Sequence, residues 1–313
     1  MKTIYGYLTE YLKEHFQFKL YFFTTLLVAI LLWINFSLDL EDNHIDTIPN
    51  GYLRWFFFIL LQGIPYYLVC MLVVLFTKKQ SWIKRKEFWL ISLFGIVILG
   101  LDRSNILLEF LIEDITNIYN YAFYRRILGN LIGFLTILFP MWLLYYFVLK
   151  KDLNHFYGIR ITGVRLKPYW VMLLIMVPLI FMASFQEDFL NVYPTYQGTG
   201  AQLMIDNMGL SNGYLLAVYE TSYASVFFIV EIMFRGFFIF ALVKYMGKEV
   251  VLPMAVTYCV LHFGKPLGEA ISSYFGGYLL GLIALKTENI YGGIMVHVGI
   301  ALLMEFFAYL QYM

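Results

Sequence analysis

Residues 218–240 read VYETSYASVFFIVEIMFRGFFIF, a long apolar run that carries three charged side chains, Glu220, Glu231 and Arg235. A charge at the middle of a bilayer costs at least ~2.5–3.5 kcal/mol on insertion scales, so such groups usually face a bundle interior and have a function. Glu231 and Arg235 are four residues apart, so a helix places them on one face as an ion pair. Glu220 shares that face and lies about 16 Å from Glu231 along a straight helix. The stretch predicts either a functional polar site or a buried ion pair that only holds helices together.

The composition of the whole chain identifies a class of protein. Of 313 residues, 61% are hydrophobic and only 14% are charged, and the mean hydropathy is +0.72. Soluble domains are about a quarter charged. These values predict an all-α, polytopic integral membrane bundle whose surroundings are the lipid bilayer. The net charge of +1 and the lack of a basic, aromatic-rich patch argue against a nucleic-acid partner.

Apolar runs predict about eight or nine transmembrane helices. The loops that connect successive helices alternate between basic and acidic. The positive-inside rule then places the N-terminus in the cytoplasm, together with the loops near 78–87, 150–167 and 244–250. We expect a multi-pass protein of a plasma or inner membrane, with no cleavable signal peptide. The expected spans are 19–38, 52–77, 88–111, 127–149, 168–185, 214–246, 251–264, 267–286 and 290–311.

Ionisable residues inside the expected spans are concentrated in the last hundred residues. We therefore interpret residues 1–213 as N-terminal scaffold helices with an external loop, and residues 214–313 as the core bundle that carries the function. The intramembrane ionisable residues of this core are Glu220, Glu231, Arg235, His262, Lys265, Glu269, His297 and Glu305.

Two histidines accompany the intramembrane carboxylate and arginine. His262 lies in YCVLHFGKP and His297 in YGGIMVHVGIALLME. A lone intramembrane histidine is more often a packing residue, but a carboxylate with two imidazoles can activate and polarise a water. Glu231, His262 and His297 could also supply three ligands to zinc or another divalent metal. Lys265 and Glu269, four apart beyond His262, are interpreted as an ion pair that caps a bend at Pro266.

Three motifs resemble those of the CPBP family, which contains the CAAX prenyl proteases and the bacterial Abi, or bacteriocin self-immunity, proteins. They are VEIMFRG at 230–236, YCVLH at 258–262 and HVGIA at 297–301. The family signature is Glu-Glu-x-x-x-Arg-Gly, then Phe-x-x-x-His, then His-x-x-x-Asn. Tyr258 stands where Phe is usual. The matching positions are Glu231, Arg235, Gly236, His262 and His297.

The resemblance implies an intramembrane endopeptidase that acts on a peptide or lipidated-protein substrate. The implied catalytic residues are Glu231, Arg235, His262 and His297, which we expect to converge on one buried polar site. The chemistry can proceed with no metal, so the resemblance makes no cofactor certain.

Two positions depart from the signature, because Val230 replaces the first Glu and Ala301 replaces the Asn. In the family the first Glu activates the water and the Asn helps to polarise the scissile carbonyl. An active protein therefore needs another base, for which Glu231 is the first candidate, Glu269 the second and Glu220 the third. The alternatives are a catalytically silent relative, such as an immunity or assembly scaffold, and an ion- or proton-coupled transporter. The transporter is less favoured because the ionisable residues crowd into one end instead of two related halves.

Overall fold

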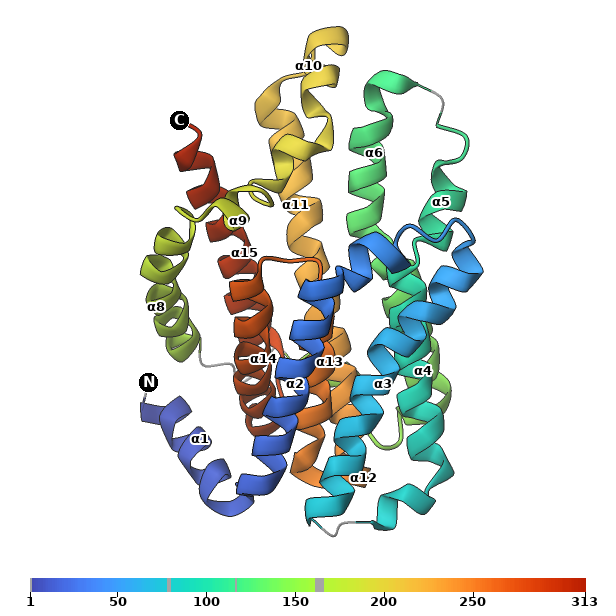
Figure 1. Cartoon of the computed structure of the whole chain (residues 1–313), viewed down its shortest axis with the longest axis vertical. Helices are drawn as coiled ribbons and strands as arrows, with labels where there is room; N and C mark the ends of the chain where they lie inside the picture. Colours follow the sequence, from blue (N-terminus) through green and yellow to red (C-terminus); the bar gives the residue numbers. More distant parts are fainter. Residues whose placement is uncertain (1, 78–79, 116, 161–165) are drawn as a thin grey trace.

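The computed structural model describes residues 2–77, 80–115, 117–160 and 166–313 of the chain, and these residues contain helices and no strands. The long helices stand roughly parallel in one bundle (Figure 1). The predicted all-α class is therefore confirmed. The α-helices are α1 (Lys2–His15), α2 (Phe18–Leu38), α3 (Gly51–Thr77), α4 (Lys86–Arg103), α5 (Ile106–Ile112), α6 (Ile118–Leu131), α7 (Phe139–Leu144), α8 (Lys167–Ala183), α9 (Glu187–Leu190), α10 (Ala201–Met208), α11 (Asn212–Glu231), α12 (Val243–Met246), α13 (Val251–Val260), α14 (Leu267–Thr287) and α15 (Tyr291–Gln311).

The remaining helical segments are π- or 3-10-helices. The π-helices are η1 (Leu40–Ile45), η3 (Phe134–Leu138), η4 (Tyr145–Leu149) and η7 (Ile232–Ala241). The 3-10 helices are η2 (Ser81–Lys84), η5 (Phe156–Gly158), η6 (Thr195–Thr199) and η8 (Gly247–Val250). Extended π-helix is rare in proteins and is frequent at functional sites. The longest such segment, η7, continues α11 directly after Glu231.

Among the described residues, six helical stretches are long and apolar enough to cross a membrane: 18–38, 51–77, 86–112, 118–149, 212–241 and 291–311. A seventh is added if α8 is joined to the stretch 187–208, which is bent from it by 98°. The expected eight or nine spans are therefore not confirmed. The segments expected at 251–264 and 267–286 correspond to α13 and α14. Since α13 has ten residues, it is about 15 Å long, half of a bilayer core.

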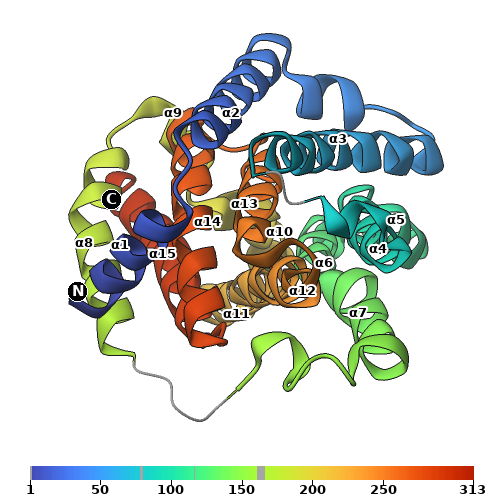
Figure 2. The ribbon, with the colours of Figure 1, turned by 90° about the horizontal axis from the view of Figure 1, so that it is seen from below.

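The core of the bundle lies around α13 and η7. All ten residues of α13 are buried, as are nine of the ten in η7. Around them pack α3 and α4 from the first half of the chain and α14 from the second, with α13 near the middle when the molecule is viewed from below (Figure 2). The two parts predicted at 1–213 and 214–313 therefore share one core.

A close backbone contact joins these two parts. A Cβ atom on Gly236 would lie 2.8 Å from the carbonyl oxygen of Tyr157, so only glycine fits there without displacement. Tyr157 belongs to η5 and has left-handed backbone angles, φ 45° and ψ 42°. The glycine of the FRG sequence thus lets η7 pack directly against the loop that follows the fourth predicted span.

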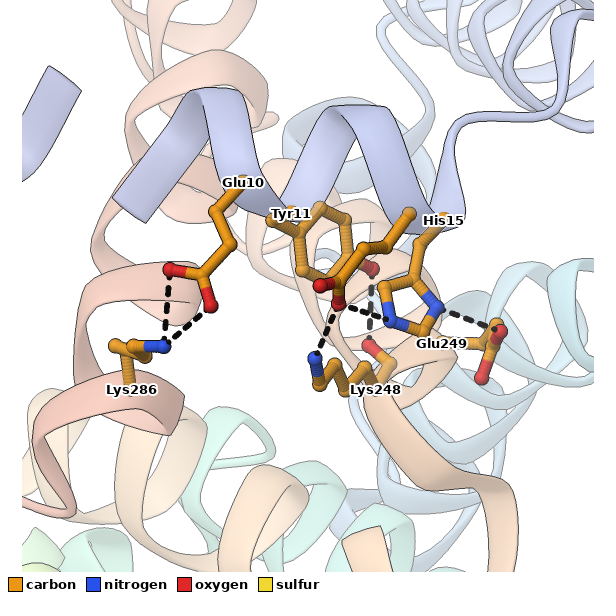
Figure 3. Close-up of polar contacts among 7 residues, drawn as sticks. Glu10, Tyr11, His15, Lys248, Glu249 and Lys286 are labelled. Carbon is orange, nitrogen blue, oxygen red and sulfur yellow. Dashed lines mark hydrogen bonds and ion pairs between the residues drawn. The ribbon is translucent and has the colours of Figure 1, made fainter. Parts of the chain in front are cut away.

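The N-terminal helix α1 is separate from the first membrane helix and is held by polar contacts (Figure 3). Glu10 forms an ion pair with Lys286 at the end of α14, with 2.8 Å between Oε1 and Nζ. The Tyr11 hydroxyl donates to the backbone carbonyl of Lys248 at 3.1 Å. In Figure 1, α1 and α12 lie at the same, lower end of the bundle. The positive-inside prediction requires this common end, and the orientation itself stays a prediction.

Candidate active site

Glu231 is the last residue of α11 and is fully buried. Arg235, one turn further on and also fully buried, places Nη1 2.9 Å from Glu231 Oε1. This ion pair lacks hydrogen-bond geometry, and within the described parts of the chain the three guanidinium nitrogens have no hydrogen-bond acceptor. Instead, the guanidinium carbon lies 4.2 Å from the centre of the Tyr258 ring. Charge and a cation–π contact, not a bidentate fork, therefore position Arg235.

His297, in α15, contacts the same carboxylate. Its Nδ1 atom lies 3.0 Å from Glu231 Oε1, and its Nε2 atom lies 3.1 Å from the hydroxyl of Tyr258. The imidazole also packs against Phe227 of α11, with 4.7 Å between the ring centres. Both ring nitrogens of His297 are thus engaged, one on each side of the imidazole.

His262 lies in the turn that follows α13, and Tyr258 connects it to this network. Its Nδ1 atom is 2.8 Å from the Tyr258 backbone carbonyl, and the two rings are 4.6 Å apart. Among the residues that the structure describes, Nε2 of His262 has no hydrogen-bond partner. The structure therefore brings Glu231, Arg235 and His297 into direct contact and joins His262 to them through Tyr258.

The start of α15 approaches Glu231 closely because of a glycine. A Cβ atom on Gly293 would lie 2.4 Å from Glu231 Oε2. That oxygen is buried and, within the described residues, accepts no hydrogen bond. The neighbouring Gly292 gives similar room to the ring of Tyr169 from α8. The two adjacent glycines thus let α15 pack against both α11 and α8, as small residues do in membrane bundles.

Comparison with known protein families identifies one part of the chain. A family model described as type II CAAX prenyl endopeptidase Rce1-like matches residues 212–303. The match covers less than a third of the chain, and residues 212–303 are called the Rce1-like segment below. No curated protein and no solved structure matches the chain. The match begins with α11 and ends within α15, so it includes the helices that carry Glu231 and His297.

Lys265 and Glu269 of the Rce1-like segment do not form the direct ion pair that the sequence predicted. The hydroxyl of Tyr193 lies between them, donating to Glu269 Oε2 at 2.9 Å and accepting from Lys265 Nζ at 3.4 Å. Since Tyr193 belongs to the loop before α10, nothing in the sequence pattern linked it to this bend. In the described part of the chain, Glu269 makes no hydrogen bond or ion pair with either imidazole.

Glu220 and Glu305, the two remaining intramembrane carboxylates expected from the sequence, lie apart from the histidine network. Glu220 has a buried Oε2 atom without a hydrogen-bond partner among the described residues, and it contacts neither imidazole. Glu305 accepts hydrogen bonds from the backbone nitrogen and the hydroxyl of Thr195, at 2.9 and 2.5 Å. Glu305 therefore anchors the loop between α9 and α10.

Tyr258 is the site residue whose contacts the sequence analysis missed. It stands four residues before His262 in the Rce1-like segment, so helical spacing alone predicts that the two side chains lie on one face of a helix. The proximity of its hydroxyl to His297 could not be read from the sequence, because the two residues belong to different helices.

The residues expected to bind a metal are placed for hydrogen bonding. Within the described ranges, no group of three or more His, Cys, Asp or Glu side chains is arranged to hold a metal ion. His297 would have to break its contact with Glu231 or with Tyr258 to present a nitrogen to a metal. Zinc at Glu231, His262 and His297 stays a prediction that requires such a rearrangement.

Proposed function

We propose that this multi-pass membrane protein is an intramembrane endopeptidase of the CAAX protease type, which hydrolyses a peptide bond in a membrane-bound peptide or lipidated protein. The observation that carries the proposal is the buried contact between Glu231 and His297, 3.0 Å between Oε1 and Nδ1. It joins two separate motifs of the Rce1-like segment and gives a carboxylate an imidazole partner and an arginine counter-ion. Such a group can act as general base or as electrostatic stabiliser.

In the proposed reaction, a water oxygen attacks the carbonyl carbon of the scissile peptide bond while a base accepts the water proton. The base later returns this proton to the leaving amine, as the C–N bond breaks. Glu231 is the first candidate, because its Oε2 atom has no hydrogen-bond partner within the described chain. The positive charge of Arg235 stabilises the ionised form of Glu231, and His297 orients the carboxylate by its contact with Oε1. His262 contributes a second acceptor, Nε2.

The competing hypothesis is a catalytically silent relative. It is favoured by Val230 and Ala301, which stand where the family signature has a Glu and an Asn. Neither side chain can accept or donate a proton. Val230 is half-buried, and Ala301 is buried in an apolar cluster with Tyr219 and Tyr223. Peptidase activity of the purified chain separates the two hypotheses.

The test uses full-length protein in lipid nanodiscs and a panel of prenylated and unprenylated peptides, with cleavage followed by mass spectrometry. We expect wild-type cleavage that falls at least about 100-fold in Glu231→Gln, the usual contribution of a general base. Glu109→Gln is the control, because Glu109 is an ion-paired carboxylate on α5 that makes no contact with the histidine network. A well-folded wild-type protein that cleaves no peptide would favour the silent relative.

A further inference from the structure

We propose that Tyr258 is a positioning residue that fixes which nitrogen carries the hydrogen on each of the two imidazoles, leaving Nε2 of His262 as the one ring nitrogen open to a substrate water. The inference deepens the proposed peptidase function and rests on it for its catalytic meaning. Tyr258 reaches the two histidines through two different groups, its side-chain hydroxyl and its backbone carbonyl.

The Tyr258 hydroxyl and the Glu231 carboxylate together determine the state of His297. Nδ1 of this imidazole faces a carboxylate oxygen of Glu231 at 3.0 Å, and a carboxylate only accepts hydrogen bonds, so Nδ1 carries the hydrogen. In a neutral imidazole Nε2 is then an acceptor. The atom that faces Nε2 is the Tyr258 hydroxyl oxygen at 3.1 Å, which donates its hydrogen. His297 is thus held between a donor and an acceptor. Flipping its tautomer would break the contact with Glu231 and would require the Tyr258 hydroxyl to change from donor to acceptor.

The backbone carbonyl determines the state of His262. A carbonyl oxygen also only accepts, so Nδ1 of His262, at 2.8 Å from it, carries the hydrogen. The lone pair of a neutral His262 is then on Nε2. Because both nitrogens of His297 are engaged, the open acceptor of the imidazole pair belongs to His262.

The Tyr258 ring is held firmly enough to perform this role. It is 5% exposed. Phe234 packs edge-on against it at 5.1 Å, and the Arg235 guanidinium covers the ring at 4.2 Å. A Cβ atom on Gly277 of α14 would lie 2.7 Å from Tyr258 Cδ1, so the ring packs directly against the backbone of α14 at this glycine. These contacts prevent the hydroxyl from turning away from His297.

The role depends on a single oxygen atom. Phenylalanine, the usual residue of the family motif at this position, would retain the ring, the arginine contact and the carbonyl. It would leave Nε2 of His297 without a donor. We therefore expect Tyr258→Phe to change His297 and to leave the tautomer of His262 unchanged, which makes His262 an internal reference.

The experiment measures imidazole nitrogen shifts by NMR on full-length protein in nanodiscs, labelled with ¹⁵N-histidine. The chain has five histidines, so His297→Gln and His262→Gln variants assign the two signals. In wild type we expect both residues to carry hydrogen on Nδ1 and an unprotonated Nε2. In Tyr258→Phe, the Nε2 signal of His297 should shift, because this nitrogen loses its hydrogen-bond donor while Glu231 still accepts from Nδ1. The wild-type spectrum is informative even if the variant fails to fold.

Peptide cleavage provides the second readout. We expect Tyr258→Phe to lower kcat about tenfold with KM unchanged, the effect of losing one orienting hydrogen bond. Tyr67→Phe is the matched control, because it removes a tyrosine contact of the same length, 3.1 Å to Ser92, away from the site. A protonated Nε2 on wild-type His297, or an unchanged His297 in Tyr258→Phe, would overturn the inference. A wild type that cleaves nothing would overturn the peptidase function alone, because the spectra still decide the role of Tyr258.

Discussion

Glu231 and His297 are 66 residues apart in the sequence, and their side chains meet in the interior with 3.0 Å between Oε1 and Nδ1. The same Glu231 oxygen lies 2.9 Å from Arg235 Nη1. One carboxylate oxygen therefore connects α11, η7 and α15. Changes to either partner of this oxygen should alter the packing of three helical segments together with the chemistry of the site.

Replacing Arg235 by alanine should destabilise the protein by about 3–5 kcal/mol, because the buried Glu231 carboxylate loses its counter-ion. Arg235→Lys should recover only part of this loss, since lysine cannot reproduce the planar contact with the Tyr258 ring. Thermal unfolding in detergent measures both effects. Lys244→Ala, which removes an exposed ion pair with Asp152, is the control and should cost less than about 1 kcal/mol. Equal losses of stability in Arg235→Ala and Lys244→Ala would show that the buried ion pair stabilises the protein no more than an exposed one.

Two glycine-to-alanine substitutions should have opposite effects. In Gly293→Ala the new methyl group would lie 2.4 Å from Glu231 Oε2, so Glu231 or α15 must move, at about 1–3 kcal/mol and with loss of activity. Gly276→Ala is the matched control in a helix interior, because no atom lies within 4 Å of its Cβ position. Alanine there should be neutral or stabilising by up to about 1 kcal/mol. Unfolding temperatures and cleavage rates compare the two, and an active, stable Gly293→Ala would contradict the assigned packing.

Val230→Glu restores the first residue of the family signature. The new carboxylate would be rotated by about 100° from Glu231 around the helix, so it should add a base without displacing the pair with His297. We expect peptide cleavage equal to or faster than that of wild type. The informative contrary result is an inert wild type together with an active Val230→Glu, which would identify the natural chain as a silent relative.

The attachment of α1 should weaken in acid. The hydrogen bond and charge of Lys248 lower the pKa of Glu14 below its usual value. A lowered pKa in the folded state means that the contact stabilises the docked helix above the ordinary glutamate pKa, and that this contribution is lost as the pH falls through the lowered value. A nitroxide at position 5, introduced as Tyr5→Cys on an exposed side chain, should become more mobile in that range. Glu14→Gln should remove this pH dependence, and an unchanged profile would exclude Glu14 as its source.

Metal removal tests the remaining cofactor prediction. Since both nitrogens of His297 are engaged in hydrogen bonds, we expect 1,10-phenanthroline to leave peptide cleavage unchanged. Inhibition that added zinc reverses would show instead that Glu231, His262 and His297 rearrange to bind the ion.

The sequence predicted the helical class and the contact between Glu231 and Arg235, because a spacing of four residues fixes neighbours on a helix. It was less informative about the number of spans. Burial inside protein and exposure to lipid both select apolar residues, so the fully buried α13 had the composition of a membrane span. It also gave no sign of the π-helix after Glu231, nor of the way Tyr193 separates Lys265 from Glu269, since both depend on packing between distant segments.

The packing of Gly236 on the backbone of Tyr157 has a consequence for how the chain can be divided. The two residues lie on opposite sides of the segment 189–213 in the sequence, so a chain divided there separates them. A fragment that starts at residue 212 would contain the whole Rce1-like match and yet lack the backbone against which η7 packs. The two halves should therefore be produced as complementary fragments, inactive when expressed separately and able to assemble in the same membrane when expressed together.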